Sequence, residues 1–328
     1  MNNISDKKTI VTGATGFIGR HLVSRLLSSD VDLTIIARDK ERALEGMPES
    51  VNIIEADLTR DLVDIPPGAD IFFHCAGEIK DHNKFYSVNV KATQKLLDEC
   101  IHKGVKKFIY LSSVGVIGAE KAGYYDELAP CFPRNSYEKS KLEAEKIVLQ
   151  YSKNRGLDIS ILRPSIVYGP GKKSEGDSFL SLITAIKNEY FRYAGDNKSI
   201  YNIIYVKDVA EALLYLAAES NSSAEKIFHL NDPIEWGSFV REVRSVLGMS
   251  GDMLSINKGV AYVAALSGEV LRTFKIKAPF SMSRYKVLTN KTVFNADRIK
   301  DNIGFNLPFT NQTGIRETVQ NYIDRGLL

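Results

Sequence analysis

Three glycines between a short apolar strand and an amphipathic helix, near the start of the chain, constrain the fold most. The segment reads Thr9-Ile-Val-Thr-Gly-Ala-Thr-Gly-Phe-Ile-Gly19. Gly13 permits a tight turn, Gly16 lets backbone approach an anion without a Cβ clash, and Gly19 lets helix and strand pack closely. Because the helix N-terminus then faces the turn, its N–H groups predict a phosphate-binding site in the first βα unit.

The first half of the 328-residue chain alternates short apolar runs with longer helical patterns, which predicts a parallel sheet covered by helices. Strands are expected at Thr9–Thr12, Asp32–Ala37, Asn52–Glu55, Ile71–Cys75, Lys107–Leu111 and Asp158–Leu162. Helices are expected at Phe17–Ser28, Asn83–His102 and Ser136–Lys153. The predicted fold class is α/β, a Rossmann-type doubly wound parallel sheet with a smaller, mostly helical C-terminal lobe.

Beyond Arg163 the pattern is less regular. We expect a helix at about 179–187, and a helix at 206–218 and a strand at 226–230 that return to the sheet. The predicted domains are therefore residues 1–165 with 203–230 for the nucleotide-binding sheet, and residues 166–202 with 231–328 for a discontinuous substrate lobe.

The composition narrows the class of partner. The net charge of +3 is small, and basic residues are interleaved with acidic ones, so we expect a small-molecule partner and no nucleic acid. Cys75, Cys100 and Cys131 form no CxxC pair or His/Cys cluster, which predicts reduced thiols without a disulfide or a metal site. The polar N-terminal stub lacks the apolar run of a secretory signal, and a cytoplasmic location is predicted.

One apolar segment, Val260–Leu271, lies between Lys258 and Arg272. It is too short to span the ~30 Å core of a bilayer, and it contains Glu269, so no membrane span is expected. The favoured interpretation is a core-facing or interface helix. An amphipathic contact with a membrane or a lipidic substrate is the alternative.

The end of the second predicted strand bears on the choice of nucleotide. A carboxylate at this place accepts hydrogen bonds from the ribose hydroxyls of NAD, whereas a cation suits the 2′-phosphate of NADP. Here Ala37 is followed by Arg38, which favours NADP(H) over NAD(H), with help from Lys40 and Arg42. The alternative is that Arg38 is solvated and Asp39 contacts the ribose.

A second motif, Ser136-Tyr137-Glu-Lys-Ser-Lys141, opens a long predicted helix. The spacing of four puts Tyr137 and Lys141 on one face. A free phenol has a pKa of about 10 and is a poor base at neutral pH until a nearby cation stabilises the phenolate. Upstream, Tyr110-Leu-Ser-Ser113 ends a strand with a hydroxyl, so Ser113, Tyr137 and Lys141 are the predicted catalytic residues.

With these motifs the sequence resembles the extended short-chain dehydrogenase/reductase family, also called NAD-dependent epimerase/dehydratase. The resemblance covers most of the chain. It rests on Thr12-Gly-Ala-Thr-Gly-Phe-Ile-Gly19, Ala56-Asp57-Leu58, His74-Cys-Ala-Gly77, Val88-Asn89-Val90, Leu111-Ser-Ser113, Tyr137 with Lys141, Arg163-Pro-Ser-Ile-Val-Tyr-Gly-Pro-Gly171, and Tyr205-Val-Lys-Asp-Val-Ala210.

The resemblance implies that Tyr137 exchanges a proton with the substrate oxygen, that Ser113 holds that oxygen, and that Lys141 also binds the nicotinamide ribose. It implies that Asp57 contacts the adenine, although a helix-capping or turn role is the alternative. A buried backbone brace is preferred for Asn89. The full predicted cofactor set is Gly13, Thr15, Gly16, Phe17, Ile18, Gly19, Arg38, Asp57, Leu58, Cys75, Ala76, Gly77, Tyr137, Lys141, Pro164 and Val167.

Departures from the family patterns narrow the reaction. Dehydratases of the family carry Thr-Asp-Glu at the end of the fifth strand, and this chain has Ser113-Val114-Gly115. A 4,6-dehydratase is therefore disfavoured, and an NAD(P)-dependent epimerase or reductase is predicted. Sugar-nucleotide enzymes commonly carry an Asn and an Arg at positions that hold Ile166 and Tyr201 here.

Arg284 could still reach a diphosphate, and Lys172 and Lys173 are spare cations; surface solvation is the alternative for all three. The predicted substrate contacts are Ser113, Tyr201 and Arg284. The predicted function is a nucleotide-sugar epimerase or keto-sugar reductase. The alternatives are a ketoreductase of the dihydroflavonol-reductase or 3β-hydroxysteroid-dehydrogenase kind on an apolar substrate and, more remotely, a non-catalytic NADP-sensing protein. The resemblance also implies a homodimer formed through residues 83–102 and 136–153.

Overall fold

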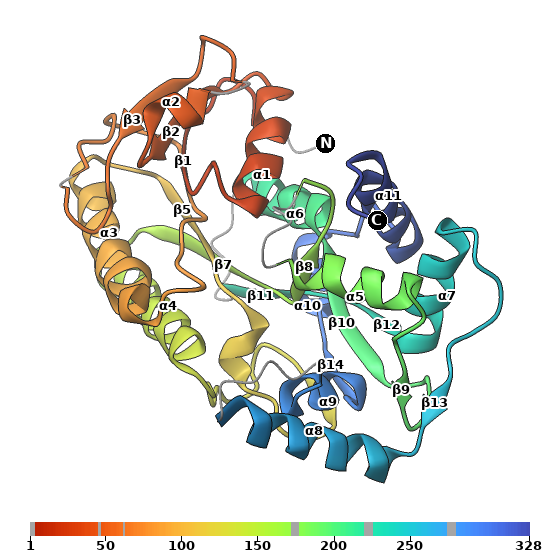
Figure 1. Cartoon of the computed structure of the whole chain (residues 1–328). Coiled ribbons are helices and arrows are strands. Elements are labelled where there is room, and N and C mark those ends of the chain that lie inside the picture. The colour runs from red at the N-terminus through yellow and green to blue at the C-terminus, as the bar shows by residue number, and fades with distance from the viewer. Residues whose placement is uncertain (1–3, 45–46, 62, 172–176, 220–225, 274–279) are drawn as a thin grey trace.

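A large parallel sheet forms the centre of the computed structural model, which describes residues 4–44, 47–61, 63–171, 177–219, 226–273 and 280–328 (Figure 1). Its strand order is β11-β7-β5-β4-β1-β2-β3. The chain moves outward from β1 to β3 and then returns to the other side of β1, so the order reverses between β1 and β4. In such sheets ligands bind at the carboxyl ends of the strands beside this reversal. The strands are β1 Lys8–Thr12, β2 Asp32–Ala37, β3 Asn52–Glu55, β4 Ile71–His74, β5 Lys107–Leu111, β7 Asp158–Pro164 and β11 Ile227–Leu230.

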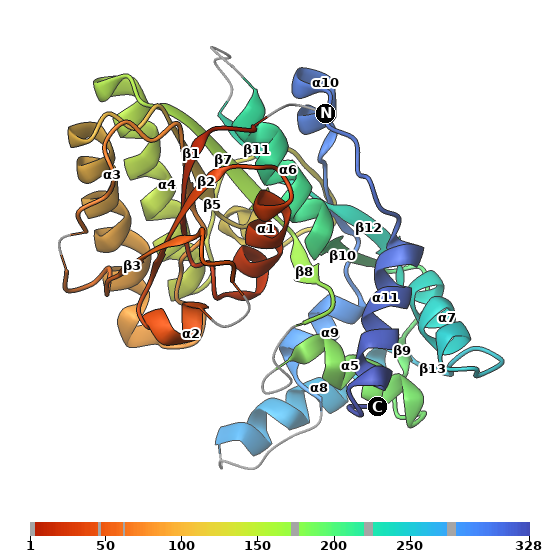
Figure 2. The ribbon, with the colours of Figure 1, turned by 90° about the horizontal axis from the view of Figure 1, so that it is seen from above.

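Helices cover both faces of this sheet because its strands are apolar on both sides (Figure 2). One face packs against α1 (Phe17–Leu27), α2 (Lys40–Leu44) and α6 (Val206–Ala218). The other packs against α3 (Ala92–His102) and α4 (Ser136–Arg155). The Rossmann-type doubly wound sheet predicted from the sequence is confirmed.

The helix expected at Asn83–His102 differs in detail. It consists of a 3₁₀ turn (η1, His82–Lys84), a π-helical segment (η2, Phe85–Lys91) and α3. Such wide turns are typical of functional sites, where they redirect a side chain. The side chain concerned here is Asn89, which is 1% exposed.

The rest of the chain builds a smaller lobe around an aromatic core. Tyr201 stacks on Trp236 with ring centroids 4.2 Å apart, and Phe239 packs edge-on against both. Its helices are α5 Ser178–Lys187, α7 Trp236–Val246, α8 Lys258–Thr273, α9 Met282–Leu288 and α11 Asn311–Asp324. The helix α10, Asp297–Ile303, packs instead against the face of the large sheet that α1 and α6 cover. Short strands accompany them, namely β6 Gly123–Tyr125, β8 Ile166–Tyr168, β9 Tyr193–Ala194, β10 Ile200–Tyr205, β12 Asp232–Glu235, β13 Ser255–Ile256 and β14 Thr292–Phe294.

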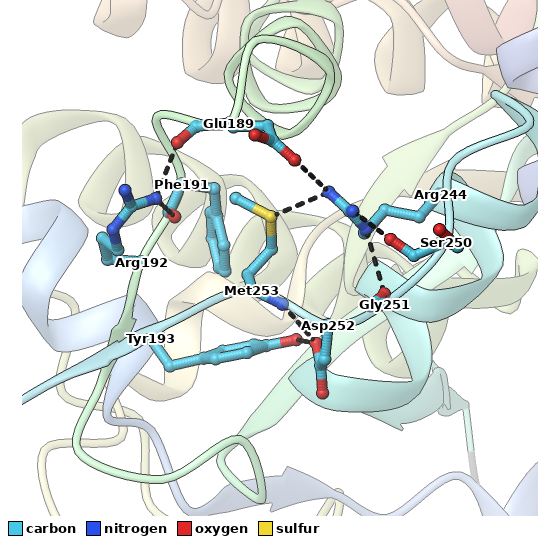
Figure 3. A network of polar contacts seen from close by, with 9 residues as sticks. All are labelled: Glu189, Phe191, Arg192, Tyr193, Arg244, Ser250, Gly251, Asp252 and Met253. Carbon is cyan, nitrogen blue, oxygen red and sulfur yellow. Dashed lines mark hydrogen bonds and ion pairs between the residues drawn. The ribbon is translucent and has the colours of Figure 1, made fainter.

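One buried arginine fastens a corner of this lobe (Figure 3). Arg244, on α7, donates from Nε to the carbonyl oxygen of Gly251 at 3.1 Å and from Nη2 to that of Ser250. Its Nη1 lies 3.4 Å from Glu189 and 3.1 Å from the sulfur of Met253. The guanidinium therefore holds the loop that leads into β13, which pairs with β9.

Two contacts fix the lobe to the sheet beside the glycine turn. The guanidinium of Arg20, on α1, donates to the carbonyl oxygens of Gly171 and Thr15 at 3.1 and 3.2 Å. Asp208, at the start of α6, accepts a hydrogen bond from the backbone N–H of Phe309 at 3.1 Å, ahead of α11. These contacts hold the smaller lobe at the carboxyl end of the large sheet.

Candidate active site

The glycine turn follows β1 at the point where the sheet order reverses. Gly13 has a φ of +73°, and a Cβ there would lie 2.6 Å from the backbone nitrogen of Ala76. A Cβ on Gly19 would collide with the carbonyl oxygen of Gly13. Since only glycine fits at both positions, the turn and the start of α1 form a backbone cradle.

The N-terminus of α1 faces this cradle without a side-chain cap. Its N-cap residue, Gly16, has no side chain that could accept a hydrogen bond from the N–H groups of the first turn. Phe17 and Ile18 open the helix, and both pack partly against the core of the smaller lobe. The N–H groups of this turn can receive an anion, so the predicted glycines fit the pyrophosphate of a dinucleotide.

A buried histidine that the sequence analysis did not single out braces this turn. His74 is fully buried, its Nδ1 lies 2.7 Å from the hydroxyl of Thr12, and its Nε2 lies 2.9 Å from that of Thr93. The Thr12 hydroxyl also accepts a hydrogen bond from the backbone N–H of Ala76 at 3.3 Å. Burial, and then the charge of Lys141, lowers the pKa of His74 to about 3, so the ring stays neutral.

The structure also describes the residues at the end of β2. Arg38 is exposed directly after Ala37, the last residue of β2. Asp39 accepts a hydrogen bond from the backbone N–H of Arg42 at 2.9 Å and thereby caps α2. One carboxylate oxygen of Asp39 is therefore engaged within the protein.

Asp57 has the geometry of a turn residue. Its Oδ1 accepts hydrogen bonds from the backbone N–H and the hydroxyl of Thr59 at 2.9 and 2.7 Å. These two bonds, with smaller contributions from Arg60 and Arg38, lower the pKa of Asp57 and keep it ionised. Leu58 next to it packs partly against the core beneath α3 and α4.

The loop after β4 is held from the opposite side by Asn89. The Asn89 amide accepts a hydrogen bond from the Glu78 N–H at 2.8 Å and donates to the Glu78 carbonyl at 3.0 Å. It also donates to the Ser140 hydroxyl on α4 at 2.9 Å. Asn89 is the buried brace favoured by the sequence, and it fixes the backbone that follows Cys75, Ala76 and Gly77.

Tyr137 and Lys141 lie in the first turns of α4. The Lys141 Nζ, in the buried interior, donates to the Leu111 carbonyl oxygen at 2.6 Å and lies 4.2 Å from the centre of the Tyr110 ring. Burial lowers the pKa of Lys141 to about 8. Tyr137 packs edge-on against Phe85 with ring centroids 5.8 Å apart, and burial, with the Glu138 charge, raises its pKa to about 12.

Ser113 lies at the end of β5, one residue beyond Ser112. Its backbone is extended, and its hydroxyl accepts a hydrogen bond from the backbone N–H of Gly115 at 3.1 Å, which caps the short helix η3 (Val114–Ile117). Ser113 is half-buried, as is Tyr137. Since β5 also supplies the Leu111 carbonyl that holds Lys141, one strand end positions both groups.

A second carboxylate that the sequence analysis missed lies beside this serine. Glu138 is 8% exposed, and a Cβ on Gly115 would lie 3.2 Å from its Cγ and 3.3 Å from the Ser113 Oγ. The Glu138 carboxylate accepts a hydrogen bond from the Arg134 N–H at 2.6 Å, and its own N–H donates to Asn135. The one feature of the sequence that could have indicated Glu138 is its position directly after Tyr137.

Beneath Lys141, α4 carries a buried ion pair. Glu145, one turn beyond Lys141, accepts from the Arg163 Nε at 2.9 Å and from its Nη2 at 2.6 Å, and both side chains are nearly inaccessible. Several buried polar atoms near the ends of β5, β7 and β11 have no partner among the described residues, which leaves hydrogen-bonding capacity for water or substrate. They are Tyr110 OH, Ser112 Oγ, Arg163 Nη1, Ser165 Oγ, His229 Nε2 and Asn231 Oδ1.

The predicted substrate contacts lie in different environments. Tyr201 is 7% exposed within the aromatic stack, whereas Arg284 is exposed on α9. Ile166, which follows β7, is 46% exposed. Pro164 ends β7, and Val167 lies in β8 between the two lobes. Lys172 and Lys173 lie outside the described residues.

A family comparison agrees with this arrangement. The model of the NAD dependent epimerase/dehydratase family matches residues 9–230, which contain the cradle and the Ser113, Tyr137 and Lys141 group. The chain belongs to this family. It is an NAD(P)-dependent enzyme of the extended short-chain dehydrogenase/reductase type, and it has a pyridine nucleotide as its cofactor.

Individual relatives differ in what their names describe. The chain is 29% identical to the 3beta-hydroxysteroid-dehydrogenase/decarboxylase isoform 1 of Arabidopsis thaliana, over 97% of this chain and 80% of that protein. It is 25% identical to the N-acetyl-alpha-D-glucosaminyl-diphospho-ditrans,octacis-undecaprenol 4-epimerase of Escherichia coli O157:H7, over 95% and 94%. The solved UDP-N-acetylglucosamine 4-epimerase of Methanobrevibacter ruminantium M1 covers 98% of this chain and all of its own, with a TM-score of 0.75 and 24% identity.

Proposed function

We propose that this protein interconverts a secondary alcohol and a ketone on a substrate that carries an apolar group. A bound nicotinamide supplies or accepts the hydride. Tyr137 exchanges the proton with the substrate oxygen, and Ser113 donates a hydrogen bond to that oxygen. Lys141, whose ammonium donates to the Leu111 carbonyl, would support a phenolate on Tyr137 during oxidation.

The observation that carries the apolar assignment is the character of the side chains beside the site. Ile79, two residues after Gly77, is 67% exposed, and Ile166, two residues after Pro164, is 46% exposed. Phe132 is 69% exposed, and its backbone N–H donates to the Ile117 carbonyl of η3. We call these three residues the apolar rim; large exposed apolar side chains next to reactive groups favour an apolar ligand.

A nucleotide-sugar epimerase or keto-sugar reductase is the second candidate. Two observations favour it: Arg284 is exposed on α9, and the relatives include an epimerase of a sugar diphosphate. On this alternative, Arg284 would contact the diphosphate. Tyr201 would contribute through its hydroxyl only if the aromatic stack rearranged.

Thermal unfolding with ligands separates the two candidates, because a ligand that binds only the folded state raises its stability. On the first proposal, NADPH raises the melting temperature, UDP, GDP and dTDP add nothing, and apolar ketones are reduced with consumption of NADPH. An additive shift with one nucleoside diphosphate would refute it in favour of the nucleotide-sugar candidate.

We further propose NADP(H) as the preferred cofactor, with Arg38 as the contact to the 2′-phosphate. Replacing Arg38 by Asp should change the ratio of the NADP and NAD dissociation constants by about tenfold or more in favour of NAD. Asp39→Asn is the matched variant, because Asp39 caps α2 and should affect both nucleotides alike. If Asp39→Asn weakened NAD alone and Arg38→Asp left the ratio unchanged, Asp39 would be the ribose contact.

Two assignments concern the whole protein. We propose a homodimer formed through α3 and α4, which lie side by side on one sheet face and are joined by a Tyr151–Asp98 hydrogen bond of 2.5 Å. A monomeric mass at micromolar concentration would contradict it.

We also propose a cytoplasmic location, which the three cysteines without a disulfide support. Cell fractionation would test this location.

A further inference from the structure

The helix α8 presents an exposed apolar face along one edge of the smaller lobe (Figure 1). Its inner side carries Ala261 and Ala265, which are fully buried. The opposite side, which we call the α8 face, is formed by large apolar residues between 40% and 61% exposed. They are Val260, Val263, Leu266, Val270 and Leu271.

The described charged side chains of α8 are directed elsewhere. The Lys258 side chain packs beside Gly195: a Cβ on Gly195 would lie 3.7 Å from the Cβ of Lys258. The Glu269 carboxylate accepts a hydrogen bond from the backbone N–H of Met282 at 3.1 Å. Five large exposed apolar side chains along one side of a helix, accompanied there by the small polar Ser267, are uncommon on a soluble protein and mark an interaction site.

The sequence of α8 and its flanks carries almost only positive charge. Residues 254–291 contain seven lysines and arginines and a single carboxylate, Glu269, whereas the whole chain has a net charge of only +3. The helix α9 packs against α8 through the rings of Tyr262 and Tyr285, 5.5 Å apart. It carries Arg284 and Lys286 exposed beside the face.

We infer that the α8 face docks onto an anionic membrane surface, with α8 lying in the plane of the headgroups. Apolar side chains on one face and cations around it are the two attractions that hold such helices on anionic lipid. A second copy of this chain is a poorer occupant, because a symmetric contact would bring the same positive charges together. Within the described residues, no helix is long and apolar enough to cross a membrane, so the contact is peripheral.

Vesicle flotation tests this inference with the full chain. Phosphatidylcholine vesicles containing phosphatidylglycerol should carry the protein upward, and vesicles of phosphatidylcholine alone should carry much less. Added salt should weaken the binding, because it screens the charge. The double variant Val263→Asp with Leu266→Asp should reduce binding by about tenfold or more. Tyr190→Asp, at a position 80% exposed in the same lobe, is the matched control and should bind like the parent.

The variants are compared at equal folded concentration, which the melting temperature with NADPH reports. The inference fails if the parent does not float with anionic vesicles, or if the double variant floats as well as the parent. It also fails if the double variant only converts a dimer to a monomer, since a second copy would then cover the α8 face. Loss of flotation with unchanged NADPH binding would support docking whatever the substrate proves to be.

Discussion

Tyr137, the proposed proton donor, is followed by Glu138 at the start of α4. Burial raises the pKa of Tyr137 to about 12, and the Glu138 carboxylate contributes in the same direction. The phenol is therefore protonated at neutral pH and suited to protonating the oxygen of a ketone. Oxidation needs the phenolate, so it should become faster as the pH rises.

Replacing Glu138 by Gln should lower the pKa of Tyr137, because it removes a nearby negative charge. The pH profile of alcohol oxidation should then move toward lower pH by on the order of half a unit. Glu143→Gln, on the exposed side of the same helix, is the control. An unchanged profile for Glu138→Gln would show that Glu138 only caps the helix through Arg134 and Asn135.

His74 should make the folded state sensitive to acid. Its pKa is about 3 in the folded protein and near 6.5 when the chain is unfolded, so between these values only the unfolded chain binds the proton. The free energy of unfolding should fall as the pH drops through this window, by up to ~1.4 kcal/mol per pH unit from this group.

Denaturant unfolding of His74→Gln between pH 6.5 and 4 measures this effect. The variant should show a shallower pH slope than the parent, whatever its absolute stability. His102→Gln, at the exposed end of α3, should keep the parental slope. Equal slopes for His74→Gln and the parent would mean that His74 titrates alike in both states.

Arg244 links α7 to the loop at Ser250 and Gly251 and to Glu189 (Figure 3). Truncation to Ala would leave the carbonyl oxygens of Ser250 and Gly251 without this donor. We expect a loss of about 2–3 kcal/mol in the free energy of unfolding. Arg241→Ala on the same helix should cost ~0.5 kcal/mol or less, since its ion pair with Asp252 is 3.8 Å long and exposed. Equal effects would contradict the role given to Arg244.

Elements with a strong periodic pattern were predictable from the sequence. β2, β3 and β5 have the predicted bounds, and β1 begins one residue earlier than predicted, because each is a short, mainly apolar run. The π-helical segment η2 was not predictable, since its turn is widened to place Asn89 between the loop after β4 and Ser140. The short strands of the smaller lobe were not predicted either. Each has only two to six residues, which is too few to show a period of two, and these strands pair only in the assembled lobe.

At the scale of the molecule, the residues proposed for the site from the sequence are those whose type follows from local geometry. Gly13 and Gly19 are required by sterics, and Lys141 with Tyr137 by helical spacing. His74, Glu138 and the Glu145–Arg163 pair emerged only from the structure. Their partners lie up to 62 residues away for His74, and their roles depend on burial that no local pattern reveals.

The two lobes contribute different parts of the proposed site. The sheet and its helices carry the cradle and the proposed proton-transfer residues, whereas the smaller lobe contributes an aromatic core, the apolar rim residue Ile166 and the α8 face. The proposed reactive groups and the apolar rim both lie within the family-matched residues 9–230, whereas Arg284 and the α8 face lie beyond them. Relatives named for a hydroxysteroid and for a sugar diphosphate both align over nearly the whole of this chain.

The most direct test of the central claim is single-turnover hydride transfer by Tyr137→Phe, measured together with NADPH affinity by calorimetry. Phenylalanine keeps the packing against Phe85 and removes only the hydroxyl. We predict unchanged NADPH affinity and a fall in the transfer rate of about 10²-fold or more, since a positioned acid–base group contributes that much. A variant that bound NADPH and transferred hydride at the parental rate would contradict the assignment of Tyr137 as the proton donor.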